Sequence, residues 1–360
     1  NWNDIRIFKK QCISLAKHFD NVSLVAPNAP TEKVDGVNVI GVSFPEIKNR
    51  KKRFLELRKL IIAAAIKVDA DIYQFHDPEL LPYAKKLKKL GKKVIYDSHE
   101  NVPAAILTKN WIKYNWLRKL VSKSYDKFEK SASKRCDGII SVLPVITETF
   151  NHPCSETIYN YPILDSDVPS VKSFSGQGTF NMVYHGGLTR QRGIKEICAA
   201  VNLLDGRDIK LHLMGGWESK EYETECLNII EDQSKVKYYG TLSFEDCQVI
   251  LKDAHLGLVL FHHSPNHLYS LPNKLYEYII NGMAVIMSDI PYWMEEFKDV
   301  VDFVDPHSPK EVVSKMTHVM DNYESIQKNI TKFQKDIIEN QSWQAEEKKL
   351  IKFYEKIINQ

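Results

Sequence analysis

The feature that most constrains the fold is an alternation of short apolar runs with amphipathic helical runs, which occurs twice along the chain. The apolar runs of the first set are NVSLVAP, DIYQFHD, KKVIYDSHE and CDGIISV. Those of the second set are FNMVYHGG, DIKLHLMGG, VKYYGTL, LGLVLFHH and MAVIMSD. Strands that alternate with helices in this way form parallel sheets covered by helices. The sequence therefore predicts two successive doubly wound α/β units.

The boundaries of these units are indicated by composition. Residues 160–179 are rich in Pro, Ser, Gly and Asp, as an interdomain linker is. We expect an N-terminal unit over residues 1–164, a linker over 165–179 and a C-terminal unit over 180–340. The stretch 341–360 is an amphipathic helix that we expect to pack back on the N-terminal unit. Two such units that face each other would place strand carboxyl ends on both walls of a cleft, where ligands bind.

Composition narrows the class of protein. The chain is 43% hydrophobic and 26% charged, which is typical of a soluble globular protein. It contains no apolar stretch of the roughly 20 residues that would span a bilayer. Its opening, NWNDIRIFKK, carries neither Met nor an apolar signal segment, so we expect a trimmed start and no secretion signal. Six scattered cysteines without a CxxC pair argue against a zinc ribbon or a disulfide framework and indicate a reduced, cytoplasmic setting.

Residues 109–135 combine Lys and Arg with aromatic and aliphatic side chains, among them Trp111, Tyr114, Trp116 and Leu120. Basic residues interleaved with aromatics suit the surface of a membrane that contains anionic lipid. A solvated helix pair whose aromatics face the core would give the same pattern, and the sequence alone leaves both interpretations open. Nucleic acid is a weaker candidate, because no recognition motif accompanies the charge.

The stretch SLPNKLYEYIINGMAVIMSD carries two charges that simple packing does not explain. Lys274 falls in the first turn of a predicted helix, where acids are preferred because the helix N-terminus is partly positive. A cation beside free amides makes sense if an anion such as phosphate is held there. Glu277, about one turn further on, could accept hydrogen bonds from ribose hydroxyls. A surface pair between Lys274 and Glu277 remains the alternative.

A second motif, VYHGGLTRQRGIKEI, places Gly186 and Gly187 at the end of a strand, before a loop with Arg190 and Arg192. Glycines let backbone amides approach a phosphate, and arginine neutralises phosphate with two parallel hydrogen bonds. The motif is not GxGxxG, so a dinucleotide fingerprint is absent and a plain strand-to-helix turn stays possible. Together with Lys274, however, it predicts two cationic loops at strand ends of one unit, which favours a pyrophosphate ligand.

Histidines also follow predicted strands. His76 ends one strand of the first unit, followed by Asp77 as a helix N-cap, and His99 with Glu100 ends the next. Their equivalent positions raise the prospect of a catalytic or substrate-binding role. The run FHHSPNH invites a metal site, but consecutive side chains of an extended run diverge and no fitting carboxylate accompanies them. We therefore expect no metal there, and instead a sugar or phosphate contact from His263 or Asn266.

These motifs make the chain similar to family 4 of the nucleotide-sugar-dependent glycosyltransferases ("group 1"), which are retaining enzymes of the GT-B fold. The resemblance covers essentially the whole chain. It is carried, in the expected order, by NDIRIFKKQCISLAK, VSLVAP, FHDPELL, YDSHEN, YHGGLTRQRGI, LPNKLYEYIINGMAVIMSD and the terminal SW helix. The fold that it implies is α/β, with two Rossmann-like doubly wound parallel-sheet domains facing across a cleft.

The resemblance also implies roles for individual residues. Arg192 matches the basic residue that contacts the diphosphate, Lys274 resembles the cation of a variant donor loop, and His99 resembles the histidine near the donor sugar and acceptor, so these three are the expected catalytic residues. The expected substrate-binding residues are Glu277, Gly186, Gly187, His76, Glu100, Asn266, Tyr269, Asn273 and Leu275.

The sequence departs from the family pattern at three places. Glu277 matches the second acid of the E-x7-E motif, which holds the ribose, but Tyr269 stands where its first acid belongs. Gly187 stands where the family usually has arginine. The family's first strand and its glycine loop, expected before Asn1, are absent from this sequence.

The expected reaction is the transfer of a sugar, with retention, from a UDP- or GDP-linked donor to an acceptor hydroxyl, with no cofactor and no metal. The acceptor would be a glycan or a lipid-linked precursor of capsule, O-antigen or lipopolysaccharide, bound by a cytoplasmic protein that touches anionic lipid at the inner face of the membrane. Two alternatives stay open: a nucleotide-sugar 2-epimerase, and a non-catalytic module that binds sugar nucleotides.

Overall fold

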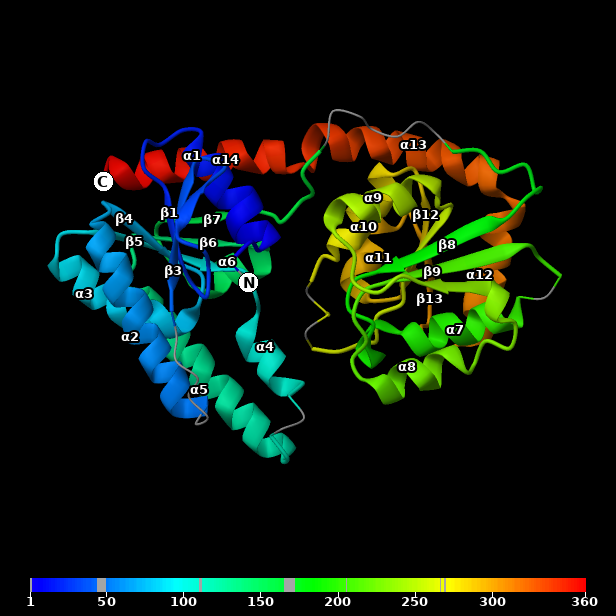
Figure 1. Cartoon of the computed structure of the whole chain (residues 1–360), viewed down its shortest axis with the longest axis horizontal. Helices are drawn as coiled ribbons and strands as arrows, with labels where there is room; N and C mark the ends of the chain where they lie inside the picture. The colour runs from blue at the N-terminus through cyan, green and yellow to red at the C-terminus, as the bar shows by residue number, and fades with distance from the viewer. Residues whose placement is uncertain are drawn as a thin grey trace. The chain divides into compact units, whose positions relative to one another are not determined.

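The chain forms two compact units in the computed structural model, which describes residues 2–43, 50–109, 112–164, 172–204, 206–265, 267–268 and 270–360, with backbone only for 50–54. The first unit comprises Asn1–Ile163 and Trp343–Gln360, and the second comprises Leu164–Ser342 (Figure 1). Among the described residues, no helix combines the length and the apolar character that crossing a bilayer requires.

The first unit holds two sheets. β4 (Ile72–Phe75), β5 (Lys93–Ser98), β6 (Gly138–Ser141) and β7 (Ser155–Thr157) pair in this order and all in parallel. β1 (Ser23–Pro27), β2 (Glu32–Val34) and β3 (Val37–Val42) form the second sheet, in the order β1-β3-β2. This sheet contains one antiparallel pair, because the tight turn at Asp35-Gly36, where both residues have positive φ, folds β2 back against β3.

Short and long helices surround these sheets (Figure 1). They are η1 (Ile5–Cys12), α1 (Ile13–Ala16), α2 (Arg50–Val68), η2 (Pro78–Tyr83), α3 (Ala84–Lys89), α4 (Val102–Leu107), α5 (Asn115–Ser133), α6 (Pro144–Thr149) and α14 (Trp343–Ile358).

The last helix, α14, belongs to the first unit although the whole second unit separates it from the rest of that unit in sequence. Its apolar face joins Ile95 and Ile140 of the sheet in one buried cluster. Gly138 explains how closely helix and strand approach, since a Cβ at this position would lie 2.6 Å from the ring of Phe353. At the start of α14, the indole N–H of Trp343 donates to the Ser14 hydroxyl at 2.9 Å.

The second unit is built on one parallel sheet of six strands. These are β8 (Phe180–His185), β9 (Ile209–Met214), β10 (Val236–Tyr238), β11 (Leu256–Val259), β12 (Ala284–Ser288) and β13 (Asp302–Val304). They lie in the order β10-β9-β8-β11-β12-β13, which is the strand order of a Rossmann-type doubly wound sheet. The central strands β11 and β12 are buried along their whole length, as strands covered on both faces are.

Helices cover both faces of this sheet, with α7, α8 and α12 on one side and α9, α10 and α13 on the other (Figure 1). The helices and short helical turns are η3 (Arg190–Arg192), α7 (Ile194–Leu203), α8 (Lys220–Leu227), η4 (Gln233–Lys235), α9 (Phe244–Asp253), α10 (Asn273–Ile280), α11 (Pro291–Phe297), α12 (Pro309–Asp321) and α13 (Tyr323–Asn340). Side-chain N-caps at Ser219, Ser243 and Ser308 set where α8, α9 and α12 begin.

Candidate active site

The strand order of the second unit marks where a ligand should bind. The chain first moves from β8 outward to β9 and β10, and then crosses back to lay β11 on the other side of β8. In doubly wound sheets, the loops that leave two such neighbouring strands in opposite directions bound a crevice at the strand carboxyl ends, and β8 and β11 are this pair. Ligands of doubly wound sheets bind at this switch point.

The loop after β8 is built for close backbone approach. Gly186 has φ +107° and Gly215, after the neighbouring strand β9, has φ +139°, and both values exclude most side chains. A Cβ on Gly215 would collide with the carbonyl of Gly186, so the two turns pack backbone against backbone. Gly193, which is left-handed at φ +68°, lies against the carbonyl of Leu260 at the end of β11. The glycines thus shape a compact turn between β8 and α7.

Two cationic side chains converge on this turn, Arg192 from η3 and Lys274 from the start of α10. A Cβ at Gly186 would lie 2.8 Å from Nζ of Lys274 and 3.3 Å from one terminal nitrogen of Arg192. The two cationic nitrogens are therefore within about 6 Å of each other, close enough for direct repulsion between their charges. Arg192 is steadied by donating to the Gly187 carbonyl at 3.3 Å. The predicted convergence of Arg192 and Lys274 is thus present in the structure.

Aromatic rings support the two cations. Nζ of Lys274 lies 5.5 Å from the ring centre of Tyr184 and 5.6 Å from that of Phe261, and the guanidinium carbon of Arg192 is 5.6 Å from the same Phe261 ring. The Tyr184 hydroxyl donates to the Gly187 carbonyl at 3.1 Å, and burial raises the pKa of Tyr184 to about 12. Rings of this kind hold cations in place without neutralising them.

The electrostatics of Lys274 are those of a cation that awaits an anion. Burial, and next the charge of Arg192, lower the pKa of Lys274 from 10.5 to about 7, while Glu277 acts weakly in the other direction. Two like charges placed together in a partly buried site are unfavourable unless a negative charge joins them. A phosphate or diphosphate would supply that charge and raise the pKa of Lys274 back toward its ordinary value.

Glu277 follows Lys274 on α10, and its carboxylate is directed to the end of β8. Its Oε2 lies 3.0 Å from Nε2 of His185, the last residue of that strand. The backbone N–H of His185 in turn donates to the Tyr278 hydroxyl at 3.3 Å. The alternative of a simple surface pair between Lys274 and Glu277 therefore does not describe this helix, since each side chain reaches a different part of the β8 turn.

The other substrate-binding residues predicted on this loop and at the start of α10 differ in how deeply they are buried. α10 begins at Asn273, and Pro272 is its N-cap, with an extended ψ of 114°. Leu275 is fully buried and helps to anchor the helix in the core, whereas Asn273 is half-buried. Asn266 and Tyr269 lie outside the described residues.

The other arginine of the turn, Arg190, is engaged elsewhere. Its guanidinium is 2.6 Å from Glu225 of α8 and lies over the ring of Tyr222 at 4.4 Å. The two arginines of the RQR motif therefore have different contacts: Arg190 anchors the turn to α8, and Arg192 lies against Gly186.

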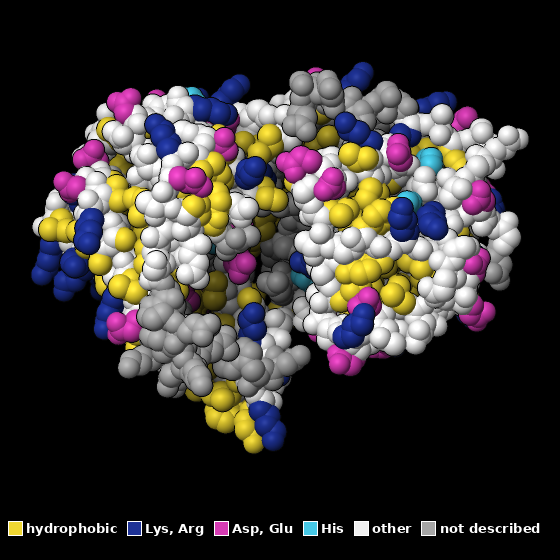
Figure 2. Space-filling view, in the orientation of Figure 1, with side chains coloured by type: hydrophobic (Ala, Val, Ile, Leu, Met, Phe, Trp, Pro, Cys, Tyr) yellow, Lys and Arg dark blue, Asp and Glu magenta, His cyan; other side chains and the backbone are white. Residues whose placement is uncertain are grey.

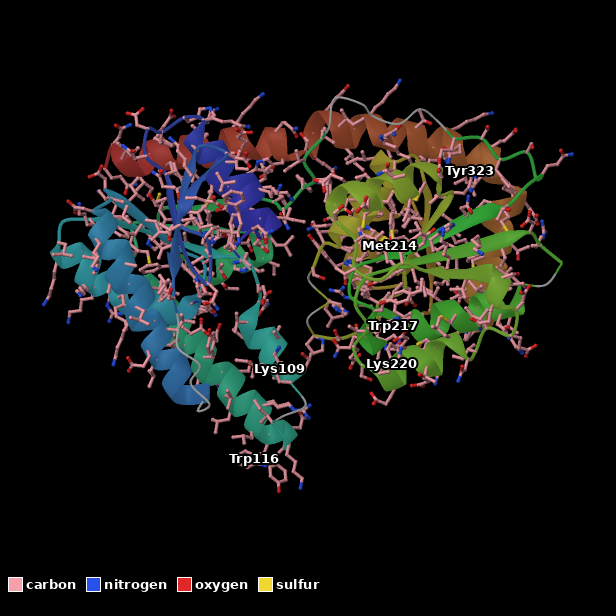
Figure 3. The ribbon with its side chains drawn as sticks, viewed as in Figure 1. Lys109, Trp116, Met214, Trp217, Lys220 and Tyr323 are labelled. Atoms are coloured by element: carbon pink, nitrogen blue, oxygen red, sulfur yellow. The ribbon has the colours of Figure 1, made fainter. Side chains whose placement is uncertain are left out.

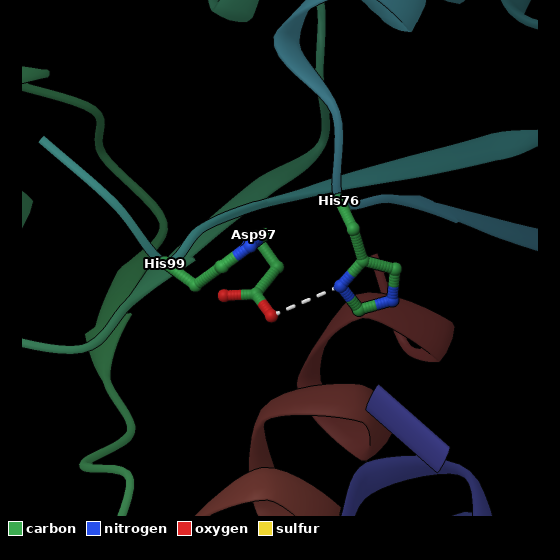
Figure 4. A group of neighbouring side chains, drawn as sticks. All are labelled: His76, Asp97 and His99. Carbon is green, nitrogen blue, oxygen red and sulfur yellow. Dashed lines mark hydrogen bonds and ion pairs between the residues drawn. The ribbon is translucent and has the colours of Figure 1, made fainter. Parts of the chain in front are cut away.

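In the first unit, His76 belongs to a buried polar network (Figure 4). Its Nδ1 is 3.1 Å from Asp97, which also accepts from Arg6 at 2.8 Å and from Gln11 at 2.8 Å. Burial opposes ionisation of Asp97, but Arg6 and His76 outweigh it and hold its pKa well below the ordinary range. Nε2 of His76 lies 3.1 Å from the Gln74 amide, so both ring nitrogens are engaged. His76 is placed to orient its neighbours rather than to exchange protons.

His99 lies next to this network and differs from His76. The centres of the two rings are 6.2 Å apart (Figure 4). Nδ1 of His99 is buried and has no hydrogen-bond partner within the described part of the chain, which leaves this ring available to a ligand. Glu100 follows it at an exposed position. Asp77 occupies the N-cap position of η2 as expected, but its side chain makes no capping hydrogen bond.

One group of residues escaped prediction from sequence. Nε2 of His262 lies 3.1 Å from Oε1 of Glu196, and the two ring centres of His262 and His307 are 4.3 Å apart. His263 next to it turns away to Asp289, at 2.8 Å. The expectation that no carboxylate accompanies these histidines is wrong, because Glu196 comes from a helix more than sixty positions earlier in the chain. No local sequence signal links the two.

Comparison with known proteins places these features in context. The sequence profile of the family described as glycosyl transferases group 1 matches residues 169–353. The chain matches none of the curated protein sequences.

Several solved structures share the fold. Sucrose-phosphate synthase from Thermosynechococcus elongatus superposes with a TM-score of 0.71 at 13% identity, over 97% of this chain and 92% of that one. Anabaena Alr3699/HepE in complex with UDP-glucose gives 0.66 at 12% identity, over 89% and 87%. A trehalose-6-phosphate structure from E. coli bound with UDP-2-fluoro glucose gives 0.67 at 12% identity, over 94% of each chain. The predicted GT-B fold class, with its parallel sheets, is confirmed by these matches.

Proposed function

This chain belongs to the glycosyl transferases group 1 family, and from that premise we propose that it transfers a sugar from a nucleotide diphosphate donor to an acceptor hydroxyl with retention at the anomeric carbon. The observation that carries the proposal is the convergence of Arg192 and Lys274 over the Gly186 turn, at the switch point of the second sheet. Two preorganised cations at this point fit a diphosphate better than any neutral ligand.

The chemical role of this pair is to stabilise the leaving group. As the bond between the anomeric carbon and the phosphate oxygen breaks, negative charge builds up on the departing diphosphate. Arg192 can donate two parallel hydrogen bonds, and Lys274 adds a point charge at the partly positive N-terminus of α10. Groups fixed before the reaction stabilise the developing charge without having to reorganise, which is where such donors gain most of their effect.

The rest of the reaction balances without a protein nucleophile. The acceptor oxygen forms its bond to the anomeric carbon on the face that the diphosphate leaves, and the acceptor proton passes to the leaving phosphate oxygen. We assign the Glu277 carboxylate to the ribose hydroxyls of the donor. We assign His99 to the transferred sugar, because its Nδ1 is buried and has no hydrogen-bond partner among the described residues. Asp97, together with Arg6 and His76, is assigned to positioning the strand end that bears His99.

The donor class is narrowed by comparison. Structures of the same fold are described as complexes with UDP, with UDP-glucose and with UDP-2-fluoro glucose. We therefore place UDP-sugars first among the donors to be tested and GDP-sugars second. For the acceptor we propose a glycan or lipid-linked precursor of capsule, O-antigen or lipopolysaccharide, handled in the cytoplasm. The described cysteines are all free thiols, which suits a reducing compartment.

A surface on the first unit supports an acceptor at a membrane. Near the start of α5, Tyr114, Trp116 and Leu120 are 54%, 65% and 55% exposed, and Tyr114 stacks on Trp116 with ring centres 6.4 Å apart. Trp116 projects from the end of the helix (Figure 3), and Figure 2 shows hydrophobic and cationic side chains together at this tip. The ammonium of Lys113 lies 5.8 Å from the Tyr114 ring, so a cation accompanies the exposed aromatic side chains. We assign this tip to a bilayer that contains anionic lipid.

The membrane assignment is tested by flotation with liposomes of phosphatidylcholine alone or mixed with phosphatidylglycerol. Trp116→Ser with Leu120→Ser should abolish flotation with the mixed vesicles, and the matched change at Val249, 64% exposed on the second unit, should not. Equal flotation of all three proteins would contradict the assignment.

The catalytic proposal is tested by thermal-shift screening of UDP- and GDP-sugars, followed by turnover of the best donor. Arg192→Ala should lower kcat by about 10²–10³-fold, the loss typical for one transition-state donor. Arg190→Ala, in the same turn but paired with Glu225, should leave turnover nearly unchanged. Near wild-type turnover of Arg192→Ala would refute the mechanism.

Product analysis separates the alternatives. An α-linked product from an α-linked donor, identified by NMR, is the expected outcome. An epimerised donor formed without any acceptor would identify a 2-epimerase instead. Binding of sugar nucleotides without hydrolysis or transfer would identify a non-catalytic module.

A further inference from the structure

Three potential metal ligands meet beside the β8 turn, from three separate elements. Glu196 lies in the first turn of α7, His262 lies three residues after the end of β11, and His307 lies three residues after the end of β13. One ligand atom of each lies within 4.8 Å of the others. Residues from strand ends and a helix start are held by the sheet itself, so the group has a rigid frame.

The two inner members of the group carry unused hydrogen-bonding capacity. Oε2 of Glu196 and Nε2 of His262 are both buried, and neither has a hydrogen-bond partner within the described part of the chain. The contact of 3.1 Å between Nε2 of His262 and Oε1 of Glu196 is near enough for an ion pair, but it is not aligned as a hydrogen bond. A buried polar atom without a partner is costly. The Glu196 carboxylate and the His262 ring therefore each offer a ligand atom to a cation, and His307 offers a third within 4.8 Å.

The backbone holds His262 in position. Its N–H donates to the Gln191 carbonyl at 2.9 Å, and its own carbonyl accepts from Nδ1 of the buried His267 at 3.0 Å. The backbone N–H and C=O of His262 are thus both hydrogen-bonded, which fixes the residue and leaves its ring as the part that can bind a ligand.

We infer that Glu196, His262 and His307 bind one zinc ion. Two imidazole nitrogens and one carboxylate oxygen match the borderline-soft character of Zn²⁺ and the three-ligand sets found in proteins. His307 is exposed, so the ion can enter from solvent and keep a water as its fourth ligand. This site is separate from the diphosphate site and takes no part in the transfer reaction proposed above.

The second potential metal group, formed by His76, Asp97 and His99, lacks these properties. Asp97 already accepts from Arg6, Gln11 and His76. The positive charge of the Arg6 guanidinium beside this carboxylate would repel a metal cation. The contrast favours the group around His262 and makes the first-unit group a control.

The position of the zinc site gives it a consequence for the donor loop. Through the bond from His262 to Gln191, an ion held at Glu196 and His262 ties the end of β11 to η3, the turn that contains Arg192. Zinc should therefore stiffen the turn that presents Arg192 to the crevice.

The inference is tested on the full chain, stripped of metal by a chelator and kept reduced, by titration with Zn²⁺ in competition with a fluorescent zinc indicator. We expect one ion per chain. Glu196→Gln, His262→Asn and His307→Ala should each weaken binding by more than about 100-fold, the upper end of the loss caused by removing an outer-shell partner alone. His263→Ala and His99→Ala should bind zinc as the wild type does.

His307→Ala is the decisive variant, because an exposed side chain can be removed without disturbing the core. Substitution of Co²⁺ gives a second readout, since ligation by two imidazoles and a carboxylate produces visible absorption bands that this variant should lose. Zinc affinity or Co²⁺ spectra that are the same in His307→Ala and in the wild type would overturn the inference. So would stoichiometric binding that only His99→Ala abolishes.

Discussion

Replacing Lys274 by methionine should stabilise the donor-free protein while it abolishes tight donor binding. Burial and the charge of Arg192 lower the pKa of Lys274 from 10.5 to about 7. Protonating this amine in the folded, donor-free protein therefore costs free energy that the unfolded chain does not incur. Methionine removes the charge and keeps an unbranched side chain of similar length between Tyr184 and Phe261.

The magnitude follows from the pKa and from the surroundings. At about 1.36 kcal/mol per pH unit, a pKa of about 7 in place of 10.5 corresponds to a cost of at most about 5 kcal/mol below pH 7. Lys274 is only partly buried, so water screens much of this cost. The variant also loses two cation–π contacts, each of about 0.5–1 kcal/mol at exposed sites. We expect a net gain of about 1–2 kcal/mol in the free energy of unfolding.

The pH dependence has a definite sign. Because the pKa of Lys274 is lower in the folded than in the unfolded chain, the unfolded chain binds more protons between about pH 7 and pH 10.5. Wild-type stability therefore rises with pH in this window relative to Lys274→Met. The advantage of the variant is complete below about pH 7 and disappears toward pH 10.5.

Urea denaturation of both proteins at about pH 6 and about pH 9, with and without UDP, measures these effects. Lys252→Met, which removes an exposed lysine on α9, serves as the control and should change stability by less than about 0.5 kcal/mol. A Lys274→Met protein that is less stable than the wild type at low pH, or whose advantage is the same at both pH values, would refute the reasoning. Stabilisation by UDP equal to that of the wild type would also refute it.

Two further substitutions test the site and its support. Gly186→Ala should weaken UDP binding more than about 10-fold and destabilise the protein by about 1–3 kcal/mol, because the new Cβ lies 2.8 Å from Nζ of Lys274 at φ +107°. Gly206→Ala is the control, because Gly206 also has a positive φ, +68°, but has open space around it. This variant should show the cost of backbone strain and leave the affinity for UDP, measured by calorimetry, unchanged. Asp97→Asn should cost about 3–5 kcal/mol in urea denaturation, because it leaves the buried Arg6 guanidinium without its carboxylate. The wild type should keep its higher free energy of unfolding over Asp97→Asn as pH falls to about 4 and lose it only below that pH, because the pKa of Asp97 is lowered in the folded chain. A difference in stability that disappears above about pH 4 would contradict the role of the pair.

The architecture could be predicted from sequence because it rests on local patterns. Buried strands such as Leu256–Val259 are apolar runs, and their alternation with helices leaves few parallel arrangements. The meeting of Arg192 with Lys274 could be predicted for the same reason, since both flank strands whose carboxyl ends share one edge of a sheet.

The contacts that could not be predicted join residues far apart in the sequence, and they depend on the direction in which each side chain points. Arg6 and Asp97 are 91 positions apart, and nothing near either residue indicates their buried pair. Glu196 meets His262 because a helix start and a strand end face each other, and a pattern read along the chain does not contain that relation. The antiparallel β2 was missed because a three-residue strand, Glu32–Val34, is too short to show a period.

The account depends most on a positive site in the second unit that exists before the donor arrives. Isothermal titration calorimetry of UDP and GDP, each compared with its nucleoside, tests this directly on the wild type and on the double variant Arg192→Ala with Lys274→Met. We predict that the wild type prefers one diphosphate over its nucleoside by at least about 100-fold, as two charge-assisted hydrogen bonds would give, and that the double variant loses this preference. A double variant that still binds the diphosphate as tightly as the wild type would contradict the account.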